Sequence, residues 1–162
     1  MTELDPSNGA YALNLGDAYY RVKDWDNAVA ALETAAANGQ EAKAKGVFSN
    51  LYLARCQEAL KLKKYQEAID FATKANEYKE NANAYKLGAS AARVLNNLPA
   101  CEEMYMKYLE LKPNAKDAAG VKFTIAALYQ QIGNKDKAKE YYQLVTSDPQ
   151  FGAQAQEVLK TL

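Results

Sequence analysis

Pairs of small residues recur at a fixed separation along this chain, each in a stretch whose apolar residues follow a helical period. Three pairs are separated by twelve residues: Gly16 and Ala28, Cys56 and Ala68, and Ala126 and Ala138. Two helices can approach closely only where both lack bulk at the crossing point. The spacing therefore predicts helix hairpins joined by short turns. Gly88 stands thirteen residues before Cys101, so we expect the turn of that hairpin to hold one extra residue.

Helical patterns cover nearly the whole chain, and no segment alternates apolar and polar residues as a half-buried strand would. The predicted helices cover residues 9–22, 25–38, 41–62, 65–78, 82–95, 98–111, 116–132, 135–147 and 150–161. Pro99 fits a first helical turn, where the missing N–H of proline does no harm. Asn38 and Gly39 indicate the end of a helix.

The composition is that of an ordinary soluble protein, with 49% apolar and 25% charged residues. The 20 basic and 20 acidic residues cancel, so net charge favours neither nucleic acid nor an anionic membrane as a partner. The apolar runs are shorter than the roughly 18 residues that a membrane span needs. Histidine is absent, and Cys56 and Cys101 match no zinc or redox spacing. We therefore expect no enzymatic activity, no metal site and no cofactor, and we expect no disulfide between these two cysteines.

The repeated pattern resembles the tetratricopeptide repeat, whose signature is W-x2-L-G-x2-Y, then A-x3-F, then P, over about 34 residues. The matching residues are Leu15, Gly16, Tyr19, Ala28 and Leu32 in the first unit, Leu87, Gly88, Tyr105 and Pro113 in the third, and Ala126, Tyr129, Ala138 and Tyr142 in the fourth. The leading tryptophan is absent throughout, and the second unit departs most, with Cys56 in place of the glycine.

This resemblance implies an all-α fold, a right-handed α-solenoid of about four tetratricopeptide helix hairpins plus a C-terminal capping helix. Residues 1–162 would form a single array, with units over 9–40, 41–80, 81–114 and 115–148 and a capping helix over 150–161. In this family the first helix of each pair lines a concave face. The partner-binding residues that the resemblance implies are Leu13, Asp17, Tyr20, Arg21, Asn50, Leu53, Gln57, Lys61, Tyr85, Ala89, Arg93, Phe123, Ala127, Gln130 and Gln131.

Large aromatic residues stand at three of these positions. Tyr20, Tyr85 and Phe123 can cover a bound peptide with little loss of side-chain entropy. The other tyrosines of the repeat are expected to pack helix against helix: Tyr19, Tyr65, Tyr105, Tyr129 and Tyr142.

Basic residues stand at three further positions. We expect Arg21, Lys61 and Arg93 to occupy equivalent places in successive units and to form a basic row along one edge of the groove. A row of this kind favours an extended or helical peptide with some acidic character. Basic residues near the end of a helix are also favoured by the helix dipole, so a purely structural explanation stays open.

The predicted function is a protein–protein interaction scaffold that binds a peptide or partner segment in the concave groove. Two alternatives stay open: a structural or self-associating segment of a longer repeat protein, and a non-catalytic accessory domain of a larger enzyme or complex. Residues 4–8 resemble the end of a preceding repeat, which suggests that the chain is a piece of a longer protein. The compartment stays open between the cytoplasm and, if an upstream signal peptide was removed, the periplasm or the exterior.

Overall fold

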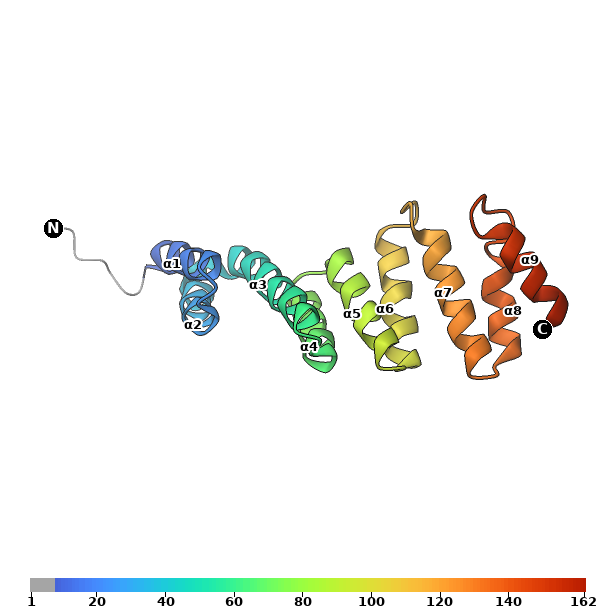
Figure 1. The fold of residues 1–162 in the computed structure, drawn as a ribbon. Helices are drawn as coiled ribbons and strands as arrows, with labels where there is room; N and C mark the ends of the chain where they lie inside the picture. Colours follow the sequence, from blue (N-terminus) through green and yellow to red (C-terminus); the bar gives the residue numbers. More distant parts are fainter. Residues whose placement is uncertain (1–7) are drawn as a thin grey trace.

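A computed structural model describes residues 8–162, which fold into a row of antiparallel helices (Figure 1). The elements are α1 (Gly9–Arg21), α2 (Trp25–Ala35), the π-helical segment η1 (Ala36–Gln40), α3 (Glu41–Lys61), α4 (Tyr65–Tyr78), α5 (Ala82–Val94), α6 (Leu98–Leu111), α7 (Ala118–Gln131), α8 (Lys135–Gln143) and α9 (Gly152–Thr161). No strand occurs within these described residues. The fold is therefore an all-α solenoid of four helix hairpins followed by α9, as predicted, while its right-handed sense stays a prediction.

The same turn joins the two helices of every hairpin. Its central residue has a left-handed backbone with φ between 54° and 78°, and this residue is Lys23, Lys63, Asn96 or Gly133. The residue that follows donates its backbone N–H to the carbonyl five residues earlier, as Asp24 does to Tyr19 at 3.0 Å. Asp24, Asn97 and Asn134 then cap the second helix by accepting a backbone N–H with their side chains. Three of the four turns therefore also cap the helix that follows, whereas Lys64 at the second turn makes no such bond.

The third turn is no longer than the others, so the sequence-based expectation of an extra residue was wrong. Three residues separate α5 from α6, as they separate α1 from α2. The fully buried residue that stands twelve positions before Cys101 is Ala89, one position after Gly88. Because Gly88 and Ala89 are adjacent and both small, local spacing alone did not distinguish them.

Replacing Lys63 by glycine is expected to raise the free energy of unfolding by about 0.5–1 kcal/mol. A left-handed backbone costs a residue with a side chain roughly 1–2 kcal/mol, and this outweighs the larger entropy that glycine loses on folding. Lys63 has φ 58°, is exposed, and makes no ion pair within residues 8–162. Urea unfolding of Lys63→Gly measures this change in stability, and Gly133→Ala, measured in the same way, should be less stable than the parent. A Lys63→Gly variant that is less stable than the parent would contradict the prediction.

Small residues let the two helices of a hairpin touch. A Cβ atom added to Gly16 would lie 2.7 Å from Cγ of Leu32, so α1 and α2 are in direct contact there. Ala28 is completely buried, and so are Ala126 and Ala138 at the equivalent positions of the fourth hairpin. The predicted close approach of paired helices at these residues is confirmed.

The chain changes direction between the first and second hairpins at Gly39, where φ is 86°. The helix end predicted at Asn38 and Gly39 is therefore confirmed, although regular α-helix already stops at Ala35. The carbonyl group of Asn38 packs against Gly9 so closely that no Cβ would fit there. Glycine at the start of α1 thus allows η1 to lie against the first hairpin.

Successive hairpins pack with unequal closeness. A Cβ atom added to Gly88 of α5 would lie 2.8 Å from Cβ of Ala72 in α4, so the second and third hairpins are in tight contact. The residue of α7 that stands at the equivalent position, eight before the left-handed residue of the turn, is Ile125, which is bulky and fully buried. The helices α6 and α7 also touch less extensively than α4 and α5 do.

A polar network bridges α6 to α7 and α8. The Glu102 carboxylate accepts hydrogen bonds from the hydroxyls of Tyr129 and Tyr141, the latter at 2.9 Å, and from Lys137 Nζ at 3.2 Å. Burial alone would raise the pKa of the Glu102 carboxyl, but these donors outweigh it and hold that pKa below its ordinary value. Burial, followed by the hydrogen bond to Glu102, raises the pKa of Tyr141 far above its ordinary value. The network joins the third hairpin to the fourth.

The two cysteines are free thiols, buried in different hairpins, as expected. Burial raises the pKa of both Cys56 and Cys101 to about 11. A thiol with so high a pKa is a poor nucleophile, so both residues act as small apolar packing groups.

The segment interpreted as the end of a preceding repeat, residues 4–8, lies outside the described residues except for Asn8. The Asn8 side chain accepts the backbone N–H groups of Ala10 and Tyr11 and so caps α1. At the other end, α9 packs on α8 and exposes polar residues, namely Gln154, Gln156 and Lys160.

Candidate binding surface

The repeated turn fixes which residues of the four first helices are equivalent. Ten positions before its left-handed residue stand Leu13, Leu53, Lys86 and Phe123, and six positions before it stand Asp17, Gln57, Ser90 and Ala127. These eight side chains are half-buried or exposed. Because each hairpin has the same turn, these positions share one face of α1, α3, α5 and α7, which we call the first-helix face.

In the first two hairpins the predicted residues lie on the first-helix face. Those of α1 are Leu13, Asp17, Tyr20 and Arg21, and those of α3 are Asn50, Leu53, Gln57 and Lys61. Arg21 Nε donates to Asp17 Oδ2 at 2.8 Å, so these two charges partly neutralise each other. Lys61 has no ion-pair partner among the described residues.

In the third hairpin the predicted residues are out of register by one position. Ala89 is completely buried, and Tyr85 lines a groove of about 400 Å³ between α4 and α6, beside Thr73 and Glu103. The residues at the equivalent exposed positions are Lys86 and Ser90. The binding residues of α5 were predicted on the assumption that Gly88 lies where α5 crosses α6, whereas Ala89 takes that place.

The three basic residues do not form one aligned row. Arg21 and Lys61 stand two positions before the left-handed residue of their turns, but Arg93 stands three positions before Asn96. One position corresponds to about 100° around an α-helix. Arg93 lines a cleft at the turn instead, beside Leu98.

In the fourth hairpin two predicted residues also hold the end of the array. The Phe123 ring contacts Tyr142 at a centroid distance of 5.1 Å and Phe151 at 5.2 Å. The Tyr142 hydroxyl donates to Gln130 Oε1 at 2.8 Å. Phe123 and Gln130 therefore stabilise the contacts of α7 with α8 and with the segment before α9.

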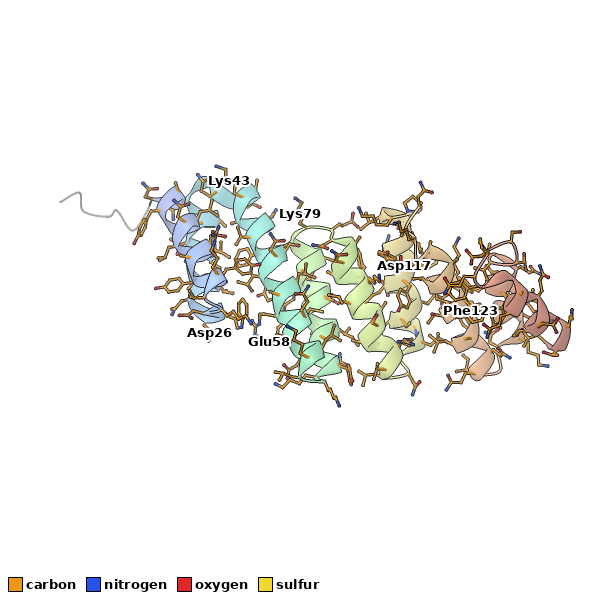
Figure 2. All side chains as sticks on the ribbon, turned by 45° about the horizontal axis from the view of Figure 1, so that its top comes forward. Asp26, Lys43, Glu58, Lys79, Asp117 and Phe123 are labelled. Carbon is orange, nitrogen blue, oxygen red and sulfur yellow. The ribbon has the colours of Figure 1, made fainter. Side chains whose placement is uncertain are left out.

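One charged cluster on the first-helix face escaped the sequence analysis. Lys86 Nζ lies 2.5 Å from Asp117 Oδ2, and the Tyr108 hydroxyl donates to Asp117 Oδ1 at 2.6 Å. Burial tends to raise the pKa of Asp117, but the hydrogen bonds from Lys86 and Tyr108 outweigh it and lower that pKa. Figure 2 shows Asp117 at the edge of the array that also carries Lys43 and Lys79. Since Lys86 and Asp117 are far apart in sequence, no local signal pairs them.

Comparison with known families decides what this repeat is. Family models described as tetratricopeptide repeat match residues 10–38 and residues 119–147. These segments are the first hairpin with part of η1, and the fourth hairpin with the residues that follow α8. The chain therefore carries tetratricopeptide repeats in its first and fourth hairpins.

Solved structures of the protein MamA are similar to this tetratricopeptide-repeat chain. One crystal structure of MamA is 20% identical with a TM-score of 0.49, and the match covers 93% of this chain and 78% of that one. A structure of MamA AMB-1 is 24% identical with a TM-score of 0.49, covering 84% and 70%. A structure of MamA MSR-1 is 22% identical with a TM-score of 0.45, covering 95% and 78%. None of the curated proteins matches the sequence.

Tetratricopeptide repeats generally mediate contacts between proteins, and such arrays are typically non-catalytic. In residues 8–162 no group of three or more histidine, cysteine, aspartate or glutamate residues is arranged to hold a metal ion. Over the same residues no helix combines the length and the apolarity that crossing a membrane requires.

Proposed function

We propose that this tetratricopeptide-repeat chain binds a segment of a partner protein along the first-helix face. The observation that supports the proposal is the identical turn of the four hairpins, which repeats exposed positions in register from α1 to α7. A row of this kind suits an extended or helical segment, since each repeat presents the same few positions to it.

The side chains on the N-terminal half of the first-helix face suit a segment of mixed character. Leu13 and Leu53 offer half-buried aliphatic surface. Tyr20 is also half-buried, and its ring centroid lies 6.3 Å from that of Trp25, a contact that limits the rotation of the Tyr20 side chain. Gln57 is exposed and has no hydrogen-bond partner in the described part of the chain. Apolar anchors beside free hydrogen-bonding groups are typical of peptide-binding surfaces. Lys61, which has no ion-pair partner among residues 8–162, favours a segment with some acidic character.

The proposal is tested with peptides selected from a display library on the full chain. Binding should weaken roughly tenfold or more in the triple variant Tyr20→Ala, Leu53→Ala, Gln57→Ala, because a few anchor residues dominate such interfaces. Fluorescence anisotropy measures the affinities. A matched control carries three neutral changes on the second helices, Thr34→Ala, Gln66→Ala and Gln143→Ala, and should bind as the parent does.

Equal binding by the triple variant and the control would overturn the proposal. Size-exclusion chromatography with light scattering separates it from the self-association alternative. A stable dimer that the triple variant dissociates would make a second copy of the chain the occupant of this face.

A further inference from the structure

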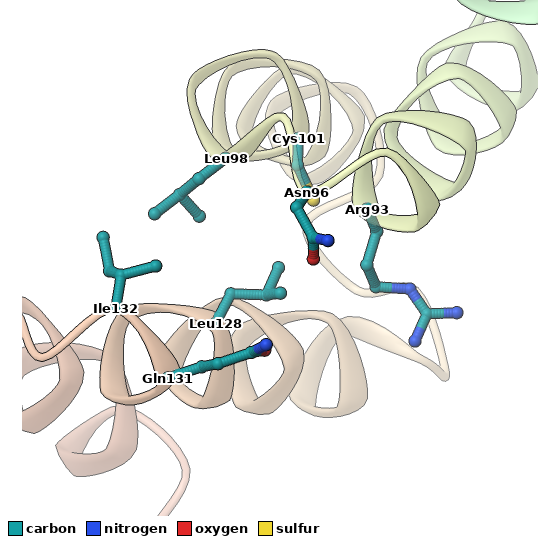
Figure 3. A pocket seen from close by; sticks show the side chains of 7 residues that line it. All are labelled: Arg93, Asn96, Leu98, Cys101, Leu128, Gln131 and Ile132. Carbon is teal, nitrogen blue, oxygen red and sulfur yellow. The ribbon is translucent and has the colours of Figure 1, made fainter.

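A cleft of about 140 Å³ opens where the third hairpin meets the fourth (Figure 3). Its lining comes from the end of α5, the α5–α6 turn, the start of α6 and the end of α7: Arg93, Asn96, Leu98, Cys101, Leu128, Gln131 and Ile132. Figure 3 shows Leu98 and Ile132 pointing toward each other across the cleft, with Leu128 between them and the Arg93 side chain. The cleft lies at the turn edge of the array and apart from the proposed anchors Tyr20, Leu53 and Gln57.

The equivalent junction between the first and second hairpins is bridged by an ion pair. There Nζ of Lys23, the left-handed residue of the turn, lies 3.6 Å from Oε1 of Glu58 in α3. At the same two positions of the third junction stand Asn96 and Leu128, which cannot form an ion pair. The first junction is therefore bridged by its own charged side chains, and the third is not.

The junction between the second and third hairpins is closed by packing. The residue equivalent to Glu58 and Leu128 is Ala91, which is completely buried because Gly88 lets α5 approach α4. In the fourth hairpin the buried Ile125 takes the place of Gly88, and α7 touches α6 less extensively than α5 touches α4. The third junction has neither the ion pair of the first nor the close packing of the second, and aliphatic side chains line its cleft.

Hydrogen bonds between α6, α7 and α8 stabilise the wall of the cleft. Glu102 and Tyr129 directly follow the lining residues Cys101 and Leu128, and their hydrogen bond joins α6 to α7. Lys137 of α8 strengthens the same link. A site held in shape before binding loses less entropy when an occupant arrives.

Charge at the cleft favours an acidic occupant. Arg93 is exposed, has no ion-pair partner within residues 8–162, and no carboxylate lines the cleft. The guanidinium group of arginine matches a carboxylate with two parallel hydrogen bonds. Asn96 and Gln131 add polar groups that can pair with a peptide backbone.

Aliphatic residues extend the surface beyond the cleft. Ile132 is 62% exposed and Leu95 is 44% exposed, and Leu62 at the equivalent place of the second turn is 63% exposed. The turns after α3, α5 and α7 lie along the lower edge of the molecule in Figure 1. Exposed aliphatic residues therefore stand at the turns that flank the cleft and at the neighbouring turn after α3.

We propose that this cleft is a second docking site, for an acidic segment of a partner protein that inserts one aliphatic or aromatic side chain between Leu98 and Leu128 and sets a carboxylate against Arg93. A cavity of about 150 Å³ with aliphatic walls accepts a benzene ring, so the cleft accommodates one such side chain. The cleft includes Arg93 and Gln131, which stand at the turn end of the first-helix face. It lies in other hairpins than the anchors Tyr20, Leu53 and Gln57, so a partner can occupy both places at once.

The test uses short peptides from a display selection on the full chain, with counter-selection against the double variant Arg93→Glu, Ile132→Asp. Recovered peptides should share an acidic residue next to a leucine, isoleucine or phenylalanine. Their affinity should fall roughly tenfold or more in that variant, since removing one partner of a desolvated charge pair has effects of this size. Arg93→Gln, which removes the charge and keeps a polar side chain, should weaken binding without disturbing the fold.

The matched control places equivalent charges at other turns, in the double variant Arg21→Glu, Leu62→Asp, which should bind these peptides as the parent does. The variant Tyr20→Ala, Leu53→Ala, Gln57→Ala should also bind them, which separates this site from the anchors proposed in the first two hairpins. Recovery of no peptide that depends on Arg93 and Ile132 would overturn the proposal. A dimer that Ile132→Asp dissociates would overturn it too, because the occupant would then be a second copy.

Discussion

Replacing Gly88 by valine is expected to lower the free energy of unfolding by about 3 kcal/mol, the upper end of the usual cost of overpacking a core. An added Cβ atom would lie 2.6 Å from Sδ of Met104 and 2.8 Å from Cβ of Ala72. The Met104 side chain can rotate away, but Ala72 is completely buried and its Cβ is fixed to the backbone of α4. The larger residue therefore forces α5 away from α4 and loosens the contact between the second and third hairpins.

Equilibrium unfolding in urea, followed by circular dichroism, measures this effect. Gly46→Ala is the matched control, because Gly46 lies inside α3 and no atom stands within 4 Å of its added Cβ. Alanine is the better helix former by about 1 kcal/mol, so the control should be more stable than the parent. Loss of contact between hairpins should also broaden the transition of Gly88→Val, since repeat arrays depend on their nearest-neighbour interfaces. Unchanged stability of Gly88→Val would show that α4 and α5 do not meet at this residue.

Signals that act within one hairpin were sufficient to predict the fold. The twelve-residue separation from Gly16 to Ala28 reflects two helices that cross near a turn of constant length, and constant turns need only local capping residues such as Asp24 and Asn134. Helix ends followed from the same residues and from Gly39. Because all of these interactions span few positions, the sequence displays them directly.

Contacts between hairpins set the features that the sequence analysis missed. Gly88 and Ala89 are both small, and only the contact with Ala72 assigns the first to the junction and the second to the hairpin crossing. This one-position error misplaced Tyr85 in the predicted groove. The cleft beside Leu128 depends on how closely α7 approaches α6, and no spacing along the chain encodes that distance.

Replacing Glu102 by glutamine is expected to lower the free energy of unfolding by about 3 kcal/mol at neutral pH, the range seen when a charged hydrogen-bond partner is removed from a buried site. The carboxylate accepts from Tyr129, Tyr141 and Lys137 together, and both tyrosines are less than 8% exposed. A glutamine side chain has one acceptor oxygen, so at least one of these donors is left without its partner. The junction of the third and fourth hairpins should weaken first.

The pH dependence of this loss identifies its cause. Since the folded chain holds the pKa of Glu102 below its ordinary value of 4.5, the carboxylate stabilises the fold above that pH, and this contribution disappears as the pH falls through the lowered pKa. The stability difference between parent and Glu102→Gln should therefore be full at neutral pH and shrink below about 4.5. Glu103→Gln changes the neighbouring exposed residue and should shift stability by less than about 0.5 kcal/mol. A difference that persists unchanged into acid would mean that glutamine disturbs packing at α6 and that the charge of Glu102 does not hold the two hairpins together.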